Sequence, residues 1–236
     1  MDKWIFEEDK VTQGIVALQK VGRIPTVTIN PASAVLKRHQ KKRYASAVQF
    51  SAPELFEDCG RYNPPGGSIA VWYAADSSLT AAAEAYGRLL HMGGPVSYPE
   101  RVLHQHYMCS IDVNRTVKVI DIVGLCQLLH IPPDSVENEN YIFTQWLMSY
   151  LHTHFGSDFD GISYSGRHYR YKRCYAFWEM PGKPLAFTDT PEGMVPYASY
   201  RETDTGIFPA GWPGTFMTGE EMFEELLNFK IMPEPK

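Results

Sequence analysis

The chain has 236 residues, of which 44% are hydrophobic and 21% are charged, and its formal net charge is -5. This composition is typical of a globular protein and excludes a disordered chain. The acidic balance argues against a protein that lives on nucleic acid, and no apolar run approaches the roughly 20 residues of a membrane span. The length favours one domain with elaborated ends. On charge and hydropathy, we expect neither nucleic acid nor a membrane as a direct partner.

The sequence shows no mark of export or of metal binding. The acidic N-terminus, MDKWIFEEDK, lacks the apolar core of a signal peptide. The histidine pairs at 104/106 and 152/154 have no third ligand at matching spacing, so no metal is expected. The cysteines form no CxxC pair, which predicts free thiols in a reducing compartment: Cys59, Cys109, Cys126 and Cys174. We expect a cytoplasmic protein, while export without a cleaved signal and oligomerisation stay open.

Strands and helices are predicted to mix along the chain. Apolar or alternating runs predict strands at 44–50, 69–75, 102–112, 117–120, 161–164 and 174–178. Helices are predicted at 79–92, 121–130 and 140–155, with a shorter one compatible with 14–21. Thr218 and Glu221 have capping-box spacing for a last short helix. The fold class is therefore α+β (mixed α/β), a single domain whose small mixed or antiparallel sheet has flanking helices.

Two segments offer cations. A basic stretch covers residues 37–43, and we favour a solvated segment over a phosphate-binding patch. The turn GRYNPPGG at 60–67 has two prolines and two glycines that fix its backbone. Arg61 there offers a planar fork of donors suited to a phosphate, and Tyr62 a flat face. A plain hairpin turn with a solvated arginine explains the same residues.

A carboxylate and two serines are the other candidates. Glu84 lies off the apolar stripe of its predicted helix, and Arg88 four residues on makes an ordinary ion pair the simpler explanation. Ser163 and Ser165 alternate, so they share one face of a strand that leads into a polar loop. Satisfied hydroxyls in a plain loop are the alternative.

Three ordered segments together resemble the RES domain family. They are GRYNPPGG at 60–67, VWYAADSSLTAAAE at 71–84, and FDGISYSGRH with CYAFW within 159–178. The resemblance covers roughly residues 44–178. It divides the chain into an N-terminal extension at 1–43, a RES-like catalytic core at 44–180 and a C-terminal extension at 181–236 that packs on the core. It also implies a fold like that of the ADP-ribosyltransferases.

The resemblance implies an enzyme that breaks down NAD+. Arg61, Glu84 and Ser165 would form the catalytic site, and Tyr62, Asn63, Tyr73 and Arg167 would bind the dinucleotide. NAD+ would be a substrate, with inorganic phosphate as a co-substrate if the reaction is phosphorolysis rather than hydrolysis, and no prosthetic group is implied. Many members are bacterial toxins, so an antitoxin or immunity protein is an expected partner.

One position departs from the family pattern. With Arg167 and His168 matched to the family's Arg-His, the serine position falls on Gly166, and Ser165 lies one place early. Either the loop shifts by one residue and Ser165 serves, or the serine is absent. Two alternatives therefore stay open beside the NAD+-cleaving enzyme: an ADP-ribosyltransferase that modifies a protein, and an inactive module that binds NAD+ or a partner.

Overall fold

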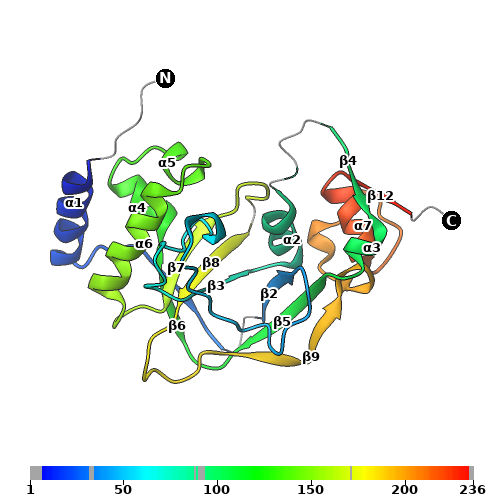
Figure 1. Cartoon of the computed structure of the whole chain (residues 1–236), viewed down its shortest axis with the longest axis horizontal. Coiled ribbons are helices and arrows are strands. Elements are labelled where there is room, and N and C mark those ends of the chain that lie inside the picture. The colour runs from blue at the N-terminus through cyan, green and yellow to red at the C-terminus, as the bar shows by residue number, and fades with distance from the viewer. Residues whose placement is uncertain (1–6, 32–34, 88, 90–93, 171, 234–236) are drawn as a thin grey trace.

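The computed structural model describes residues 7–31, 35–87, 89, 94–170 and 172–233. Across them runs one eight-stranded sheet in the order β1-β6-β7-β8-β3-β2-β5-β9 (Figure 1). Its strands are β1 (Thr26–Ile29), β2 (Val35–Gln40), β3 (Val71–Ala75), β5 (Tyr107–Val113), β6 (Val117–Asp121), β7 (Gly161–Ser165), β8 (Arg173–Trp178) and β9 (Phe187–Pro196). Among these described strands β6 and β7 alone are parallel, so the sheet is mainly antiparallel.

Helices cover the sheet in groups. Figure 1 shows α1, α4, α5 and α6 together beside β6 and β7, while α2 lies over the middle strands. At the other end, α3 and α7 accompany two small sheets, β10–β11 and the parallel pair β4–β12. The helices are α1 (Glu8–Lys20), α2 (Ser78–Tyr86), α3 (Glu100–Leu103), α4 (Ile122–Leu128), α5 (Asp134–Glu137), α6 (Ile142–Phe155) and α7 (Gly219–Glu221). The short strands are β4 (Val96–Pro99), β10 (Arg201–Glu202), β11 (Met217–Thr218) and β12 (Phe229–Met232).

The core has two parts because the sheet buries both faces. Along β3, Val71 and Ala75 belong to the cluster under the helices, whereas Trp72 and Ala74 belong to the cluster on the other face. This alternation is what a strand geometry with period two requires. Trp72 is fully buried, and its ring lies 5.2 Å from the Phe177 ring, centroid to centroid. The central strands are thus fixed from both sides.

Most of the predicted elements are confirmed, including the mixed α/β class. The strands at 69–75, 117–120, 161–164 and 174–178 correspond to β3, β6, β7 and β8, and the helix at 140–155 to α6. The helices at 121–130 and 14–21 correspond to α4 and part of α1, and the capping box of Thr218 and Glu221 is present. The helix predicted over 79–92 ends at Tyr86, and residues 88 and 90–93 lie outside the described part.

Two strand predictions are wrong, the first in extent and the second altogether. Residues 100–103 form α3, so the strand predicted to start at 102 starts at Tyr107. Residues 44–50 are a loop that runs beside β3. At Ala47 the backbone of this loop bonds to side chains and not to a neighbouring strand. The Ala47 N–H donates to Asp189 Oδ1, and the Ala47 carbonyl accepts from Trp72 Nε1. An alternating apolar pattern also suits such a half-buried loop.

The sheet draws on both predicted extensions. β2 comes from the segment 1–43 and pairs with β5 over six positions, Val35 to Gln40. β9 comes from the segment 181–236 and pairs with the other edge of β5. The division into extension, core and extension stays a prediction, and it does not coincide with the edges of the sheet.

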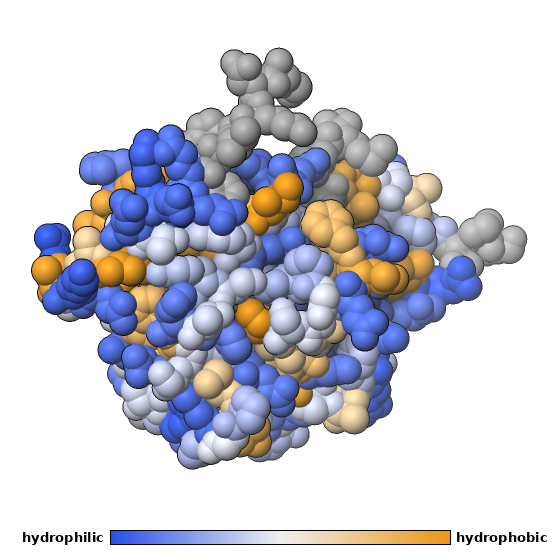
Figure 2. Space-filling view, turned by 60° about the vertical axis from the view of Figure 1, so that its left-hand side comes forward, coloured by the Kyte–Doolittle hydropathy of each residue, from blue (hydrophilic) through white to orange (hydrophobic). Residues whose placement is uncertain are grey.

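No helix within the described residues is long and apolar enough to cross a bilayer. On the face seen in Figure 2, hydrophobic residues form several separate groups between hydrophilic ones.

A tyrosine and two histidines join α2 to the sheet. The Tyr86 hydroxyl lies 2.9 Å from His39 Nε2 on β2 and 2.6 Å from His106 Nδ1 just before β5. Burial lowers the pKa of His106 to about 4 and, together with His106, that of His39 well below its usual value. Lys41 adds to both shifts. Both rings are therefore neutral at physiological pH.

This pair predicts acid sensitivity. Because the folded protein binds fewer protons than the unfolded chain below pH about 6.5, the free energy of unfolding should fall as the pH drops from about 6.5 to about 4. Each histidine contributes a slope of up to about 1.4 kcal/mol per pH unit. Urea unfolding between pH 7 and pH 4.5 measures it. In His106→Asn the slope should be smaller, and an unchanged slope would contradict the assignment.

A glycine in β7 predicts a second stability effect. A Cβ atom on Gly161 would lie 2.4 Å from the Ala176 carbonyl oxygen and 2.7 Å from Phe177 Cα on β8. Gly161→Ala should therefore lower the free energy of unfolding by about 1–3 kcal/mol. Ser163→Ala, on the same strand, is the matched control. The Ser163 hydroxyl is buried without a partner, so its removal should be neutral or stabilising. Equal unfolding midpoints for the two variants would refute the clash.

Candidate active site

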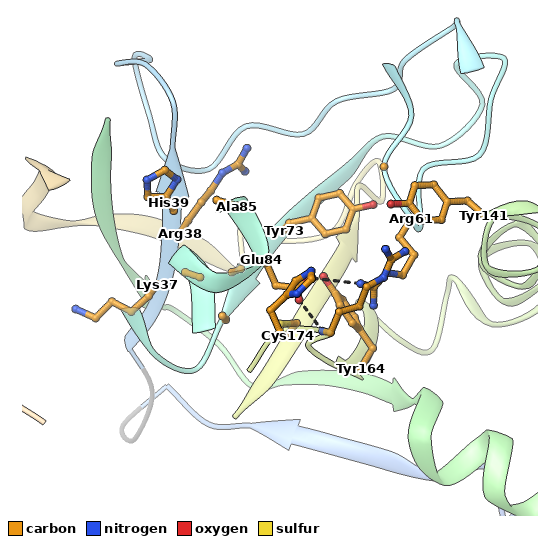
Figure 3. Close-up of a pocket in the computed structure, with 16 residues that line it drawn as sticks. Lys37, Arg38, His39, Arg61, Tyr73, Glu84, Ala85, Tyr141, Tyr164 and Cys174 are labelled. Carbon is orange, nitrogen blue, oxygen red and sulfur yellow. Dashed lines mark hydrogen bonds and ion pairs between the residues drawn. The ribbon is translucent and has the colours of Figure 1, made fainter. Parts of the chain in front are cut away.

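A pocket opens where β2 and β3 separate. The two strands are neighbours, but their register pairs only Lys37 with Ala75 among the described residues. Beyond this pair the strands diverge, and a cavity of about 310 Å³ lies against them and α2 (Figure 3). Its walls come from β2, β3, β7, α2, the turn at 60–61, the residue just before α6, the loop after β7 and the start of β8. Segments far apart in the sequence thus meet at one site.

Arg61 is held by α6 and β3. The Thr144 hydroxyl donates to the Arg61 carbonyl at 2.7 Å, and Gln145 Nε2 donates to the Gly60 carbonyl at 3.2 Å. The Tyr62 N–H donates to the Tyr73 hydroxyl at 3.0 Å. These bonds fix the backbone, so the largely buried Arg61 side chain enters the pocket from a rigid turn.

Glu84 lies opposite Arg61 and has partners on both carboxylate oxygens. Arg61 Nη2 lies 3.5 Å from Glu84 Oε2, and the backbone N–H of Arg167 donates to Oε1 at 2.8 Å (Figure 3). The alternative partner Arg88 lies outside the described residues. The structure therefore brings together Arg61, Glu84 and Arg167, which were predicted to share one site. In the sequence these residues are separated by 23 to 106 positions.

Aromatic side chains line the space beside this pair. Tyr73, Tyr141 and Tyr164 line the cavity, and the Arg61 guanidinium lies 5.3 Å from the centroid of the Tyr164 ring. Tyr62 does not line it: the ring is buried behind Tyr164, with a centroid distance of 4.7 Å. Asn63 is buried as well, and its side chain donates to the Ser51 carbonyl. Both predicted ligand-binding residues shape the turn from behind.

The pocket combines fixed cations with neutral walls. Burial alone would lower the pKa of Arg61, but interactions with Tyr62 and Glu84 raise it, so the guanidinium is charged. Burial raises the pKa of Tyr73, Tyr164 and the Cys174 thiol. These hydroxyls and this thiol are therefore protonated at neutral pH. The site suits an anionic ligand that also carries a flat ring.

Ser165 lies elsewhere. It lines a separate cavity with Ser163, Asp76 and Asp121, and it is absent from the residues that line the pocket of Glu84. A Cβ atom on Gly166, in contrast, would lie 3.1 Å from Glu84 Oε1 and 3.4 Å from Cys174 Sγ. Position 166 is thus the one beside the carboxylate, and it has no side chain.

Other pocket residues were missed or undervalued by the sequence. Lys37 and Arg38 line the cavity half-buried, although the basic stretch was interpreted as solvated; Lys41, Lys42 and Arg43 are indeed exposed. The sequence feature that could have identified Lys37 and Arg38 was the positive charge of this stretch. The other lining residues with polar or aromatic side chains that were not predicted as site residues are His39, Tyr141, Tyr164, His168 and Cys174. No local sequence pattern distinguishes these residues. His39, for example, reaches the site only because β2 pairs within the sheet.

One group outside the pocket has the donor set for a metal ion. Among the described residues, Glu100, His104 and Glu220 place their ligand atoms within 4.8 Å of one another. His104 Nε2 lies 2.7 Å from Glu220 Oε1, so a hydrogen bond between the two side chains explains the arrangement. None of the three lines the pocket.

Comparison with known proteins agrees with this architecture. The RES domain family matches residues 35–198, which is more than half of the chain and wider at both ends than the three motifs. A chain of the crystal structure of the M. tuberculosis MbcT–MbcA toxin–antitoxin complex superposes with a TM-score of 0.51 at 15% identity. The match covers 78% of this chain and 93% of that one, so the two share a fold. No curated protein matches the sequence. On the family match, this chain belongs to the RES domain family.

Proposed function

We propose that the protein cleaves the nicotinamide–ribose bond of NAD+, by phosphorolysis or hydrolysis, and acts as the toxin of a toxin–antitoxin pair. The observation that carries the proposal is the apposition of Arg61 and Glu84 across one pocket, 3.5 Å apart. Membership of the RES family supports the reaction. The toxin role is supported by the likeness to a chain of a toxin–antitoxin complex.

The carboxylate suits the reaction. Cleavage of the nicotinamide–ribose bond develops positive charge on the ribose, and a fixed carboxylate stabilises that charge. Glu84 is about one-quarter exposed and is oriented by the Arg167 N–H at 2.8 Å, so the carboxylate is in place before substrate arrives. Its second oxygen, now near Arg61, would accept from a ribose hydroxyl.

The cations and rings suit the rest of the dinucleotide. Arg61 and Arg167 offer donors to the two phosphates, or to an incoming inorganic phosphate. The charged ends of Lys37 and Arg38 are engaged elsewhere, because Lys37 Nζ donates to Ser110 Oγ at 2.8 Å and Arg38 Nη1 donates to the Gln49 carbonyl at 3.4 Å. Tyr73, Tyr141 or Tyr164 would stack on the nicotinamide ring. The charge and the ring of the ligand thus match a pocket that combines two arginines with tyrosine side chains.

Gly166 motivates the second candidate, a module that binds NAD+ without turning it over. The position beside Glu84 has no hydroxyl to orient the ribose or the amide, whereas Ser165 faces another cavity. In a third arrangement, a protein accepts the ADP-ribose. Each candidate leaves a different product.

The first measurement is NAD+ loss and nicotinamide release by the pure protein, with and without inorganic phosphate. We expect loss in at least one condition. Loss that requires phosphate identifies a phosphorylase, and equal loss without it identifies a glycohydrolase. Label from NAD+ on a macromolecule identifies a transferase. Binding of NAD+ without any product favours the inactive module.

Glu84→Gln tests the carboxylate. The variant keeps the size and the acceptor for the Arg167 N–H but removes the charge, so the rate of NAD+ loss should fall by at least about 100-fold. Circular dichroism and the unfolding midpoint should stay close to those of the unchanged protein. Ser165→Ala is the matched control, with an expected rate within about twofold because its side chain lies outside the pocket. Full activity in Glu84→Gln, or its loss in Ser165→Ala, would overturn this assignment.

A further inference from the structure

The C-terminal part of the chain lies against the helix that carries Glu84. Residues 199–232, here called the brace, lie beyond the RES match and contain β10, β11, α7, a π-helical turn at Met222–Leu226 and β12. Figure 1 shows the end of this segment, in orange and red, next to α3 and β4 on the side of the sheet where α2 lies. Two contacts join it to α2, one near each end of the helix.

The first contact lies at the start of α2. Ser78 is fully buried, and its hydroxyl donates to Glu202 Oε2 in the brace. Glu202 is buried too, and its other oxygen accepts from the N–H groups of Thr203 and Asp204 at 2.8 and 2.9 Å. The Ser78 hydroxyl also lies 3.8 Å from Met222 Sδ. A buried carboxylate with this many donors is a rigid attachment point.

The second contact lies at the end of α2. The Tyr86 ring is 1% exposed and lies 4.7 Å from the Phe223 ring and 5.8 Å from the Phe229 ring. Phe223 and Phe229 stack on each other at 4.2 Å. The Tyr86 hydroxyl reaches past them to His39 and His106. Both ring packing and hydrogen bonds of Tyr86 therefore fix this end of the helix.

The brace is itself anchored to the fold. β12 pairs with β4 over four positions, starting with Phe229 opposite Val96. At the start of α7, a Cβ atom on Gly219 would lie 1.8 Å from the Tyr197 carbonyl oxygen, so the backbones approach very closely there. Thr218 and Glu221 form both hydrogen bonds of a capping box at the N-terminus of that helix. The segment therefore has little freedom to slide along α2.

Helix geometry connects these contacts to the site. Glu84 and Tyr86 are two residues apart, which is about 200° around the helix, so they point to nearly opposite sides. Glu84 points into the pocket, and Tyr86 points to the brace. The ion pair to Arg61 is long at 3.5 Å, and so it fixes the carboxylate weakly. The Arg167 N–H orients the carboxylate at 2.8 Å, whereas the position of the helix backbone that carries Glu84 depends on what packs against the other side of α2.

We propose that the brace positions Glu84 through the rear of α2, with Tyr86 as the positioning residue and Phe223 as its main support. The effect on turnover rests on the proposed function, whereas the effect on α2 does not. Because a displacement of about 1 Å at a reacting group costs up to about 100-fold in rate, loosening the brace should lower kcat while the residues that bind the ligand stay in place.

The test compares Tyr86→Phe, Phe223→Ala and Phe223→Leu with Leu125→Ala in the full chain. Tyr86→Phe removes two hydrogen bonds and keeps the ring. Phe223→Ala removes the side chain that packs against Tyr86, and Phe223→Leu restores most of its volume. Leu125 is a fully buried residue of α4, none of whose residues lines the pocket, and it serves as the control for general loss of stability. The readouts are kcat and KM for NAD+, and hydrogen–deuterium exchange of residues 78–87.

We expect kcat to fall about 10- to 100-fold in Tyr86→Phe and Phe223→Ala with KM within about threefold, and Phe223→Leu to recover most of the rate. Exchange in α2 should rise in the first two variants and stay unchanged in Leu125→Ala. Equal effects of Leu125→Ala on kcat and on α2 exchange would overturn the proposal, as would unchanged α2 exchange in Phe223→Ala. If the unchanged protein consumes no NAD+, the proposed function fails, and the exchange data still decide whether the brace fixes α2.

Discussion

β2 and β3 are adjacent in the sheet, yet they separate after the pairing of Lys37 with Ala75. Each strand keeps a full ladder on its other side, β2 with β5 and β3 with β8, so the separation leaves the sheet intact. Ser51 pairs with Val71 where β2 has left, and the loop before it accepts from Trp72 Nε1. The polar backbone groups beside the gap are thus largely supplied with partners, as buried groups require. The loop that ends at Ser51 thus takes the place of β2 at the Val71 end of β3.

The chemistry of the pocket follows from what surrounds that gap. α6 holds the turn of Arg61 through hydrogen bonds from Thr144 and Gln145, and α2 places Glu84 in the wall of the pocket. Neither side chain is unusual by itself. A charged guanidinium and a carboxylate become effective when burial excludes water and neighbouring tyrosines stay neutral, because electrostatic interactions are stronger in such surroundings. The neutral walls are therefore as much a part of the site as the charges.

Local patterns predicted the elements well, and pairing between distant elements limited the rest. Continuous apolar runs gave β3 and β8, and the helical pattern gave α6. The sequence also predicted that Ser163 and Ser165 share a face, which is correct, and that face is the one away from the pocket. Strand parity alone could not say which face, since that depends on where α2 packs. The same reason explains Lys37 and Arg38: a basic stretch reveals its charge, but only the pairing with β5 places its first two residues at the pocket.

Arg61 and Glu84 came from the resemblance, whereas the support of Glu84 came from a region the resemblance does not reach. The family match ends at residue 198, but Glu202, Phe223 and Phe229 beyond it complete the burial of α2. A nine-residue helix is too short to be stable by itself and depends on tertiary packing. A motif can therefore specify which residue lines the pocket, while residues that support the motif's helix belong to this chain's C-terminal segment.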